Sequence, residues 1–371
     1  MKIGITCYPT YGGSGAIASE LGIELAKRGH QVHFISYELP FKINKFYKNI
    51  YFHEVEVLEY PLFKYPPYSL SLSVKMTEIF ENEGLDIMHV HYAIPHAASA
   101  YLTQRMLGKD SNFKFITTLH GTDITIVGNH SSFYKLTKFC IESSNGITCV
   151  SKYLKQLTID TFNINKNIEV IYNFVDTSKY KRNETDKKKL GLIKNNELGI
   201  IHISNFRPVK NIRNIIEIFC RINREINCKL ILVGDGPEFA FAKETVKRFD
   251  LNDKVIFLGR KDNVIPLLNS ANLYLLPSKS ESFGVSALEA LSCGLPVIGT
   301  NVGGLKEVVA NGVCGYLFDP DDINSMVNAC LDILSSKRKM EIMSAEARKT
   351  ALKFDSRIVI PIYLEYYRKI I

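Results

Sequence analysis

Hydrophobic and polar positions follow two alternating patterns along the whole chain. Short apolar runs with β-branched residues, typical of buried strands, recur between stretches whose apolar residues have helical spacing. Strands that alternate with helices in this way predict parallel sheets covered by helices, and therefore an α/β fold. The predicted strands are 2–7, 31–36, 50–58, 86–91, 113–119, 146–150 and 168–172, then 198–204, 228–233, 254–258, 272–276, 296–299 and 314–318.

The alternation is interrupted near 173–195, around the lysine-rich segment "KYKRNETDKKKLG" at 179–191. We interpret this segment as a solvated surface stretch. A chain of 371 residues is too long for one hydrophobic core. The sequence therefore predicts two α/β domains, residues 1–172 and 173–354.

Composition narrows the class of protein. The chain is 46% hydrophobic and 23% charged, with no apolar stretch near the ~20 residues of a membrane span and no signal sequence, so we expect a cytoplasmic protein. Its eight cysteines are scattered without a C-x-x-C pair, which favours buried free thiols over disulfides or a metal site. The net charge of +8 favours anionic partners, but no aromatic-interleaved basic motif indicates nucleic acid.

Polar motifs follow the predicted strands in both halves. Ligands of open α/β sheets bind beyond the carboxyl ends of strands, so this is where a site is expected. Each motif alone has a plain structural explanation, such as a turn or a surface cation, but their common location favours a binding site. The motifs are "GGSG" (12–15), "HVHYAIPH" (89–96), "TTLHGTD" (117–123), "IYNFVD" (171–176), "SNFRPVK" (204–210), "VGDGPE" (233–238), "LGRKDN" (258–263) and "SESFGVSALEALSCG" (280–294).

The "GGSG" motif lies between a predicted strand and a predicted helix. We predict that Ser14 is the N-cap of this helix and that Gly29 ends it in a left-handed conformation. Backbone N–H groups in such a turn suit a phosphate. A tight turn with no ligand is the alternative, because the G-x-G-x-x-G dinucleotide fingerprint is absent.

The segment "ESFGVSALE" places two carboxylates around a helix predicted at 284–293. The N–H groups of Phe283 and Gly284 stand at its start, where a phosphate binds well. Glu281 and Glu289 are eight residues apart, roughly 12 Å along a helix, so they cannot share one ligand atom. They suit the two ends of a nucleotide sugar, and two exposed helix glutamates are the alternative.

Together "SESFGVSALEA", "VGDGPE", "RPVK" and the early glycine loop resemble the retaining glycosyltransferases of family 4, over the whole chain. The resemblance implies a GT-B fold, in which two Rossmann-like domains face each other across a cleft and a last helix, here 355–371, crosses back to the first domain. A homodimer contact is the alternative for that helix. The first domain would bind the acceptor and the second the nucleotide sugar, without a metal or other cofactor. Within the family, "CYPTYGGSG", "HVHYAIPHA" and "TTLHGTDIT" are most similar to enzymes that transfer N-acetylglucosamine from UDP-GlcNAc to L-malate with retention, in bacillithiol biosynthesis.

The resemblance also implies roles for single residues. Lys210 would neutralise the diphosphate, Glu281 would bind the sugar hydroxyls, Glu289 the ribose hydroxyls, and His120 would approach the donor sugar. Many relatives carry an arginine at the position of Asn205, and Arg207 is expected to supply that cation here. The remaining donor contacts are expected from Gly13 and Ser14, from Gly259 and Arg260, and from Phe283, Gly284 and Val285.

Malate carries two carboxylates and needs cations and hydroxyl donors. The candidates are Ser14, Lys64, Tyr92 and Thr122, with Lys135 or Lys138 as further cations. A plain solvated lysine is the alternative for Lys64.

Two other functions stay open. One is the same chemistry on a lipid or sugar acceptor, since 131–142 has cations and aromatics suited to a membrane surface. Against it, we expect Phe133, Leu136 and Cys140 to face the core. The other is a non-enzymatic sensor of nucleotide sugars.

Overall fold

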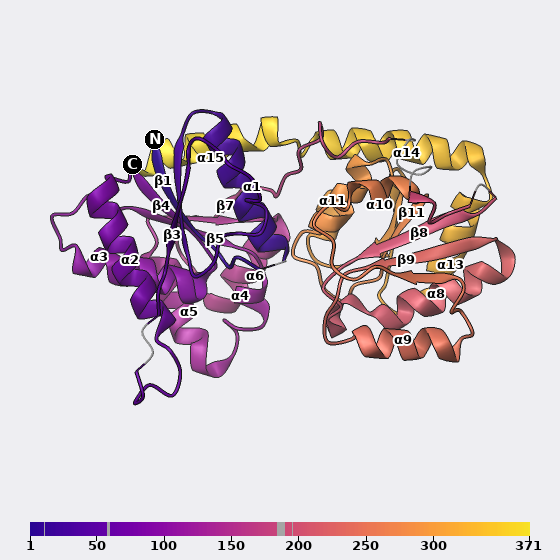
Figure 1. The fold of residues 1–371 in the computed structure, drawn as a ribbon, viewed down its shortest axis with the longest axis horizontal. Coiled ribbons are helices and arrows are strands. Elements are labelled where there is room, and N and C mark those ends of the chain that lie inside the picture. The colour runs from indigo at the N-terminus through magenta and orange to yellow at the C-terminus, as the bar shows by residue number, and fades with distance from the viewer. Residues whose placement is uncertain (11, 58–59, 184–189, 195) are drawn as a thin grey trace. The chain divides into compact units, whose positions relative to one another are not determined.

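The computed structural model describes residues 1–371 except 11, 58–59, 184–189 and 195 (Figure 1). It consists of two compact units, residues 1–173 with 357–371, and residues 174–356. The boundary expected after residue 172 differs from this by one residue. Part of the lysine-rich segment at 179–191 lies outside the described residues, so its interpretation as a surface stretch stays a prediction.

The first unit is built on a seven-stranded parallel sheet in the order β3-β2-β1-β4-β5-β6-β7. Every strand predicted for this half is present, although the third ends at Glu54 rather than at residue 58. The strands are β1 Lys2–Thr6, β2 Gln31–Ser36, β3 Ile50–Glu54, β4 Ile87–His91, β5 Phe115–Leu119, β6 Gly146–Cys149 and β7 Glu169–Val170.

The second unit repeats this topology in a six-stranded parallel sheet in the order β10-β9-β8-β11-β12-β13. All six strands predicted for this half are present. They are β8 Leu198–Ile203, β9 Cys228–Val233, β10 Val255–Phe257, β11 Leu273–Leu276, β12 Val297–Thr300 and β13 Gly315–Phe318. Counted within each unit, both sheets begin 3-2-1-4-5-6, the Rossmann order, which confirms the predicted fold class.

Helices cover the faces of each sheet (Figure 1). In the first unit, α2, α3 and α5 contribute buried residues to one core with β4 and β5. The helices described in this unit are α1 Gly13–Lys27, α2 Tyr68–Glu83, η1 Ala93–Ala97, α3 Ala98–Met106, α4 Thr122–Thr125, α5 Ser131–Ser143 and α6 Lys152–Phe162.

In the second unit, α8, α9 and α13 form a core with β8, β9 and β11. The helices described here are η2 Pro208–Lys210, α8 Ile212–Glu225, α9 Phe239–Arg248, α10 Ile265–Ser270, α11 Val285–Ser292, α12 Leu305–Val308, α13 Ile323–Leu334 and α14 Lys337–Leu352.

The last helix, α15 (Ser356–Ile370), returns to the first unit as expected, because residues 357–371 belong to it. Ile360, Tyr363 and Tyr367 are completely buried at helical spacing. The hydroxyl of Tyr366 accepts a hydrogen bond of 2.9 Å from the backbone N–H of Ile147 in β6. The apolar C-terminal segment therefore completes the core of the first domain.

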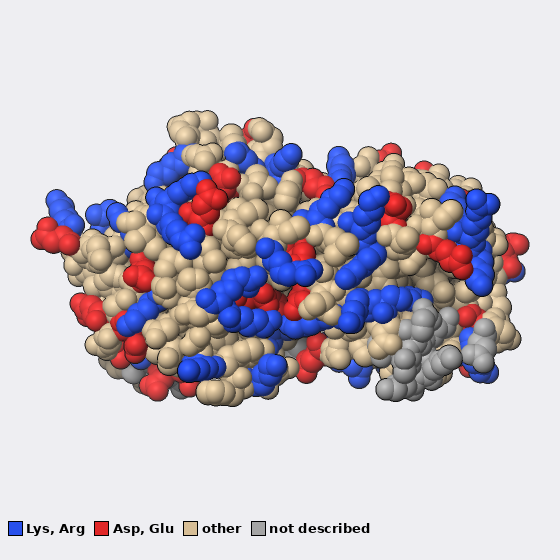
Figure 2. All heavy atoms as spheres, turned by 90° about the horizontal axis from the view of Figure 1, so that it is seen from above, with Lys and Arg blue, Asp and Glu red and all other residues tan. Residues whose placement is uncertain are grey.

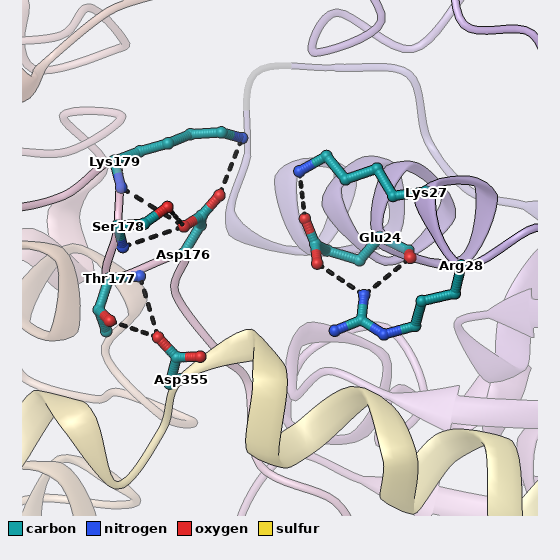
Figure 3. A network of polar contacts seen from close by, with 8 residues as sticks. All are labelled: Glu24, Lys27, Arg28, Asp176, Thr177, Ser178, Lys179 and Asp355. Carbon is teal, nitrogen blue, oxygen red and sulfur yellow. Dashed lines mark hydrogen bonds and ion pairs between the residues drawn. The ribbon is translucent and has the colours of Figure 1, made fainter.

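The two places where the chain passes between the units are tied together inside the second unit. The N–H of Val175 donates to the carbonyl of Phe354, and the N–H of Ser356 donates to the carbonyl of Val175, each at 3.0 Å. The buried carboxylate of Asp355 accepts from the N–H and hydroxyl of Thr177 (Figure 3). This pairing explains how two segments about 180 residues apart leave the domain side by side.

A second network in Figure 3 lies in α1 of the first unit. Glu24 is buried and accepts from Lys27 and Arg28, at 2.5 and 2.7 Å. Burial opposes ionisation of this carboxyl group, but the two cations outweigh it and lower the pKa of Glu24. The charge of Glu24 therefore secures the C-terminal turn of α1.

The cysteines follow the expectation from composition. All eight cysteines are buried free thiols, as predicted. Among the described residues, no helix is long and apolar enough to cross a membrane. Figure 2 shows Lys and Arg spread over one face of the molecule with Asp and Glu between them.

Two glycines of "VGDGPE" let the β9 loop approach the loop after β8. Gly234 has φ +127°, and a Cβ atom there would lie 1.8 Å from the carbonyl oxygen of Ser204. A Cβ atom on Gly236 would lie 2.1 Å from the carbonyl oxygen of Asn205. The motif thus serves close backbone packing as well as a turn.

Gly234→Ala is therefore expected to lower the free energy of unfolding by about 3 kcal/mol or more, because a backbone atom blocks the new methyl group. Gly29→Ala is the matched control. Gly29 also has a positive φ of +86°, but nothing lies within 4 Å of its Cβ position, so about 1 kcal/mol should be lost. Thermal unfolding of both variants measures the difference, and equal losses would contradict this reading of the motif.

Candidate functional site at the carboxyl ends of both sheets

The predicted site residues follow strands on either side of the point where the strand order reverses. In the first unit this point lies between β1 and β4, which lead to the glycine loop and to Tyr92. In the second it lies between β8 and β11, which lead to Lys210 and Glu281. Such switch points are where open α/β sheets bind ligands.

A cluster of hydroxyl groups forms at the switch point of the first unit. The hydroxyls of Ser14 and Tyr92 lie 2.9 Å apart, and Thr122 also hydrogen-bonds to Tyr92. The prediction that Ser14 caps α1 is wrong, because Gly12 is the N-cap and its carbonyl accepts from Ala16. Ser14 stands instead in the first turn, where its side chain is engaged by Tyr92. Gly29 has the predicted left-handed conformation.

Tyr92 itself is held in an unusual conformation. Its φ is +84°, a region that non-glycine residues rarely occupy, at the end of β4. Its ring packs edge-on against Tyr8, with 5.4 Å between ring centroids, and Tyr8 also contacts His96. Burial raises the pKa of Tyr92 to about 12, so its hydroxyl remains a neutral hydrogen-bond donor.

His120 follows β5 beside this cluster. Its Nε2 lies 2.8 Å from Nδ1 of His91, and its ring centroid lies 5.3 Å from that of Tyr92. Its backbone N–H, with those of Gly121 and Ala93, donates to the buried carboxylate of Asp123. Burial lowers the pKa of His120 to about 3, so this imidazole is neutral at pH 7.

The predicted acceptor cations are not gathered at the hydroxyl cluster. Lys64 is exposed and lies over the ring of Tyr65, 5.6 Å from its centroid. Lys135 is exposed on α5, and Lys138 donates to the carbonyls of Phe162 and Asn163 at the end of α6. In the part of the chain that the structure describes, none of these lysines contacts Ser14, Tyr92 or Thr122, so their roles stay predictions.

The expectation for the core face of α5 is only partly right. Cys140 is buried, but Phe133 and Leu136 are 40% and 41% exposed, which contradicts their predicted place in the core. Phe139 on the same helix is 44% exposed. The spacing of Phe133, Leu136 and Phe139 puts them on the solvent side of the helix, whereas Thr137, Cys140 and Ile141 pack inward.

In the second unit, Lys210 and Glu281 meet although 71 residues separate them. Nζ of Lys210 donates to Oε1 of Glu281 at 2.6 Å, and the hydroxyl of Ser278 donates to the same oxygen at 2.9 Å. Both side chains are largely buried, with 20% and 10% of their surface exposed. An ion pair that is largely buried but still partly open to solvent is suited to binding a charged ligand.

The start of α11 adjoins this pair. Gly284 is its N-cap with φ +96°, so the helix begins at Val285 rather than at Gly284. The ring of Phe283 is buried against Phe354, so its backbone and not its ring is suited to a ligand. Glu289 is half-buried one turn into the helix, and both it and Glu281 act electrostatically on the buried hydroxyl of Tyr274.

The other donor candidates lie in neighbouring loops. Asn205 is half-buried, and its Oδ1 is a buried atom without a hydrogen-bond partner. Arg207 is exposed. The carbonyl of Gly259 accepts from the N–H of Gly234, and Arg260 pairs with Asp235 at 3.6 Å. The structure thus places these loops together at one edge of the sheet, while ligand contacts by these residues stay predictions.

Sequence reasoning missed two residues at the edge of the first sheet and one at the edge of the second. They are Tyr8, which packs on Tyr92; Asp123, which accepts from three backbone N–H groups; and Ser278, which donates to Glu281. Tyr8 and Ser278 come just after β1 and β11, so the strand-end rule could have found them. Asp123 belongs to the "HGTD" motif, where its burial had no local signal.

Comparison with known proteins identifies the family. The model of glycosyltransferase family 4 matches residues 11–179, and the model of glycosyl transferases group 1 matches residues 182–350. The N-acetyl-alpha-D-glucosaminyl L-malate synthase of Bacillus anthracis is 47% identical over 99% of this chain and 96% of its own. The chain belongs to glycosyltransferase family 4.

One more distant relative and one solved structure are also similar to this glycosyltransferase. The gpi3 subunit of the Schizosaccharomyces pombe phosphatidylinositol N-acetylglucosaminyltransferase is 28% identical over 73% of this chain and 60% of its own. The crystal structure of Anabaena HepE in complex with UDP and glucose matches with a TM-score of 0.83, at 20% identity, over 99% of both chains. These matches support the GT-B fold.

The carboxyl group of Asp123 makes the stability of this glycosyltransferase depend on pH. Burial raises its pKa to about 6, although hydrogen bonds from three backbone N–H groups act to lower it. The pKa of an aspartate in the unfolded chain is ~3.9. Between these values the folded state binds more protons, so stability falls as pH rises from about 4 to about 6, by up to about 3 kcal/mol.

Asp123→Asn removes this ionisation. As the pH rises from about 4 to about 6, the free energy of unfolding should therefore fall more in the natural chain than in the variant. Urea unfolding from pH 4 to 7 measures it, with the exposed Asp110→Asn as control. Parallel curves for the natural chain and Asp123→Asn would show that Asp123 does not titrate there.

Proposed function

We propose that this glycosyltransferase transfers N-acetylglucosamine from UDP-GlcNAc to the hydroxyl of L-malate, with retention at the anomeric carbon, in the first step of bacillithiol biosynthesis. The pair of Lys210 and Glu281 is the observation that carries the donor half of the proposal. The acceptor half is supported by the name and high identity of the Bacillus anthracis relative.

In this proposal the donor binds at the carboxyl end of the second sheet. Lys210 turns from Glu281 to the diphosphate, and the first turn of α11 adds N–H groups to it. Glu281 then accepts hydrogen bonds from the sugar hydroxyls, which replace the lysine as its partners. Glu289 is assigned to the ribose. The diphosphate charge is thus met by a cation and a helix terminus of the protein, without a resident metal.

The acceptor is assigned to the hydroxyl cluster of the first unit. Ser14, Tyr92 and Thr122 supply neutral donors for the carboxylates of malate. The bond from the anomeric carbon to the β-phosphate oxygen breaks while that carbon bonds to the malate oxygen. The hydroxyl proton passes to an oxygen of the departing UDP. The protein contributes positioning and charge neutralisation rather than an acid–base pair.

A lipid acceptor is the second candidate, because α5 exposes Phe133, Leu136 and Phe139 beside Lys135. Aromatic and aliphatic groups flanked by cations suit the surface of an anionic membrane. We favour malate, since the relative named for a lipid acceptor is less similar over less of the chain.

Release of UDP from UDP-GlcNAc distinguishes the candidates. Release that requires L-malate supports the first proposal. Release that requires vesicles of phosphatidylglycerol and phosphatidylethanolamine, without malate, supports the second. No release under either condition supports a non-enzymatic sensor.

Lys210→Ala is expected to reduce malate-dependent UDP release by at least about 100-fold, because the cation that stabilises the leaving diphosphate is lost. Glu281→Ala is expected to reduce it by a similar factor, because the sugar hydroxyls lose the carboxylate that positions them. Lys279→Ala is the matched control, as this exposed lysine lies in the same loop. Circular dichroism checks the fold of each variant. Near-normal turnover by either site variant would refute the assigned donor site.

Tyr92→Phe is expected to raise the KM for malate about tenfold with little change in the KM for UDP-GlcNAc, since one hydroxyl donor is removed from the acceptor. Lys64→Ala tests the predicted cation in the same assay. An unchanged malate KM in Tyr92→Phe would move the acceptor away from the hydroxyl cluster.

A further inference from the structure

A column of three imidazole rings runs through the first unit toward the hydroxyl cluster. His89 and His91 extend from β4, and His120 follows β5. Ring centroids are 4.4 Å apart for His89 and His91 and 5.1 Å apart for His91 and His120. His89 and His91 are completely buried, and His120 is half-buried at the end of the column.

Hydrogen bonds fix both ends of this histidine column. Nδ1 of His89 lies 2.7 Å from the hydroxyl of Tyr367 in α15, and its Nε2 lies 2.6 Å from the hydroxyl of Thr118. Nδ1 of His91 lies 2.8 Å from Nε2 of His120. Burial keeps the pKa of all three imidazoles far below the ordinary value, so each carries a single proton at pH 7.

The surroundings of Nε2 of His91 indicate which of its two ring nitrogens carries the proton. Nε2 of His91 is buried and has no hydrogen-bond partner. If Nε2 carried the proton, its buried N–H would have no hydrogen-bond acceptor. Buried N–H groups without an acceptor are rarer in proteins than buried acceptor atoms without a donor. The favoured arrangement has the proton on Nδ1 of His91, donated to Nε2 of His120. His120 must then carry its own proton on Nδ1.

We propose that His91 is a positioning residue that fixes His120 as the Nδ1–H tautomer, so that His120 offers a neutral N–H donor to the bound ligand. In the described part of the chain, Nδ1 of His120 has no hydrogen-bond partner, so its N–H is available to a ligand oxygen. Because its Nε2 lone pair is occupied by His91, His120 does not act as a general base. Only the identity of the ligand, a sugar or hydroxy-acid oxygen, rests on the proposed function.

The tautomer is measurable without any substrate. In the full chain labelled with ¹⁵N-histidine, nitrogen chemical shifts at pH 7 are expected to show His120 protonated on Nδ1, with its signals assigned by their loss in His120→Gln. In His91→Leu the His120 signals should shift toward the Nε2–H tautomer, while those of the exposed His130 stay unchanged. Protonation of His120 on Nε2 in the natural chain would overturn the proposal, even if His91→Leu does not fold.

Transfer kinetics test the consequence for catalysis. His91→Leu is expected to lower kcat about tenfold or more, through misplacement of His120, with the KM for UDP-GlcNAc nearly unchanged. His91→Asn keeps an N–H close to the position of Nδ1 and should restore most of the rate. His33→Leu is the matched control, because His33 is equally buried and pairs with His53 at 2.9 Å away from the column.

The proposal would be overturned if kcat fell equally in His33→Leu and His91→Leu, or if His91→Asn did not restore the rate. Either result would mean that His91 contributes only packing. An absence of UDP-GlcNAc turnover in the natural chain would instead refute the proposed function, while the tautomer measurement would still decide the role of His91.

Discussion

The uniform direction of the strands is the constraint on which this molecule depends. Because all strands of each sheet run parallel, every strand of a domain ends at the same edge. Residues distant in sequence, such as Lys210 and Glu281 or His91 and His120, are therefore brought within hydrogen-bonding distance by topology alone. The reversal of strand order beside β1 and β8 opens room between the loops at that edge.

The two domains use this edge with different electrostatics. In the second, a cation and a carboxylate form a largely buried pair, and removal of either charge would leave the other without its partner. In the first, hydroxyl groups and neutral imidazoles line the edge, and no described lysine contacts the hydroxyl cluster. Neutral groups tolerate burial when they are hydrogen-bonded, so these groups need no ion pair to lie at this edge.

The sequence predicts the strands well because buried parallel strands have a local signature, a short apolar run between turns. It also predicts Lys210 and Glu281 as members of one site, because both follow strands. Contacts between distant segments have no such signature. The role of Ser14 as a partner of Tyr92 depends on a residue 78 positions away, and its local pattern suggested a helix cap instead. The exposure of Phe133 and Leu136 likewise depends on which side of α5 meets the other helices.

Strain and buried charge are coupled at the edge of the first sheet. Tyr92 adopts a positive φ, and this conformation directs the following chain away from the β4 ladder. The backbone N–H of Ala93, the next residue, is satisfied by the carboxylate of Asp123, which also accepts from the N–H groups of His120 and Gly121. Asp123 thus stabilises the turns after β4 and β5 at once. Its burial disfavours ionisation, so the domain gives up some stability at neutral pH to hold Tyr92 and His120 in place.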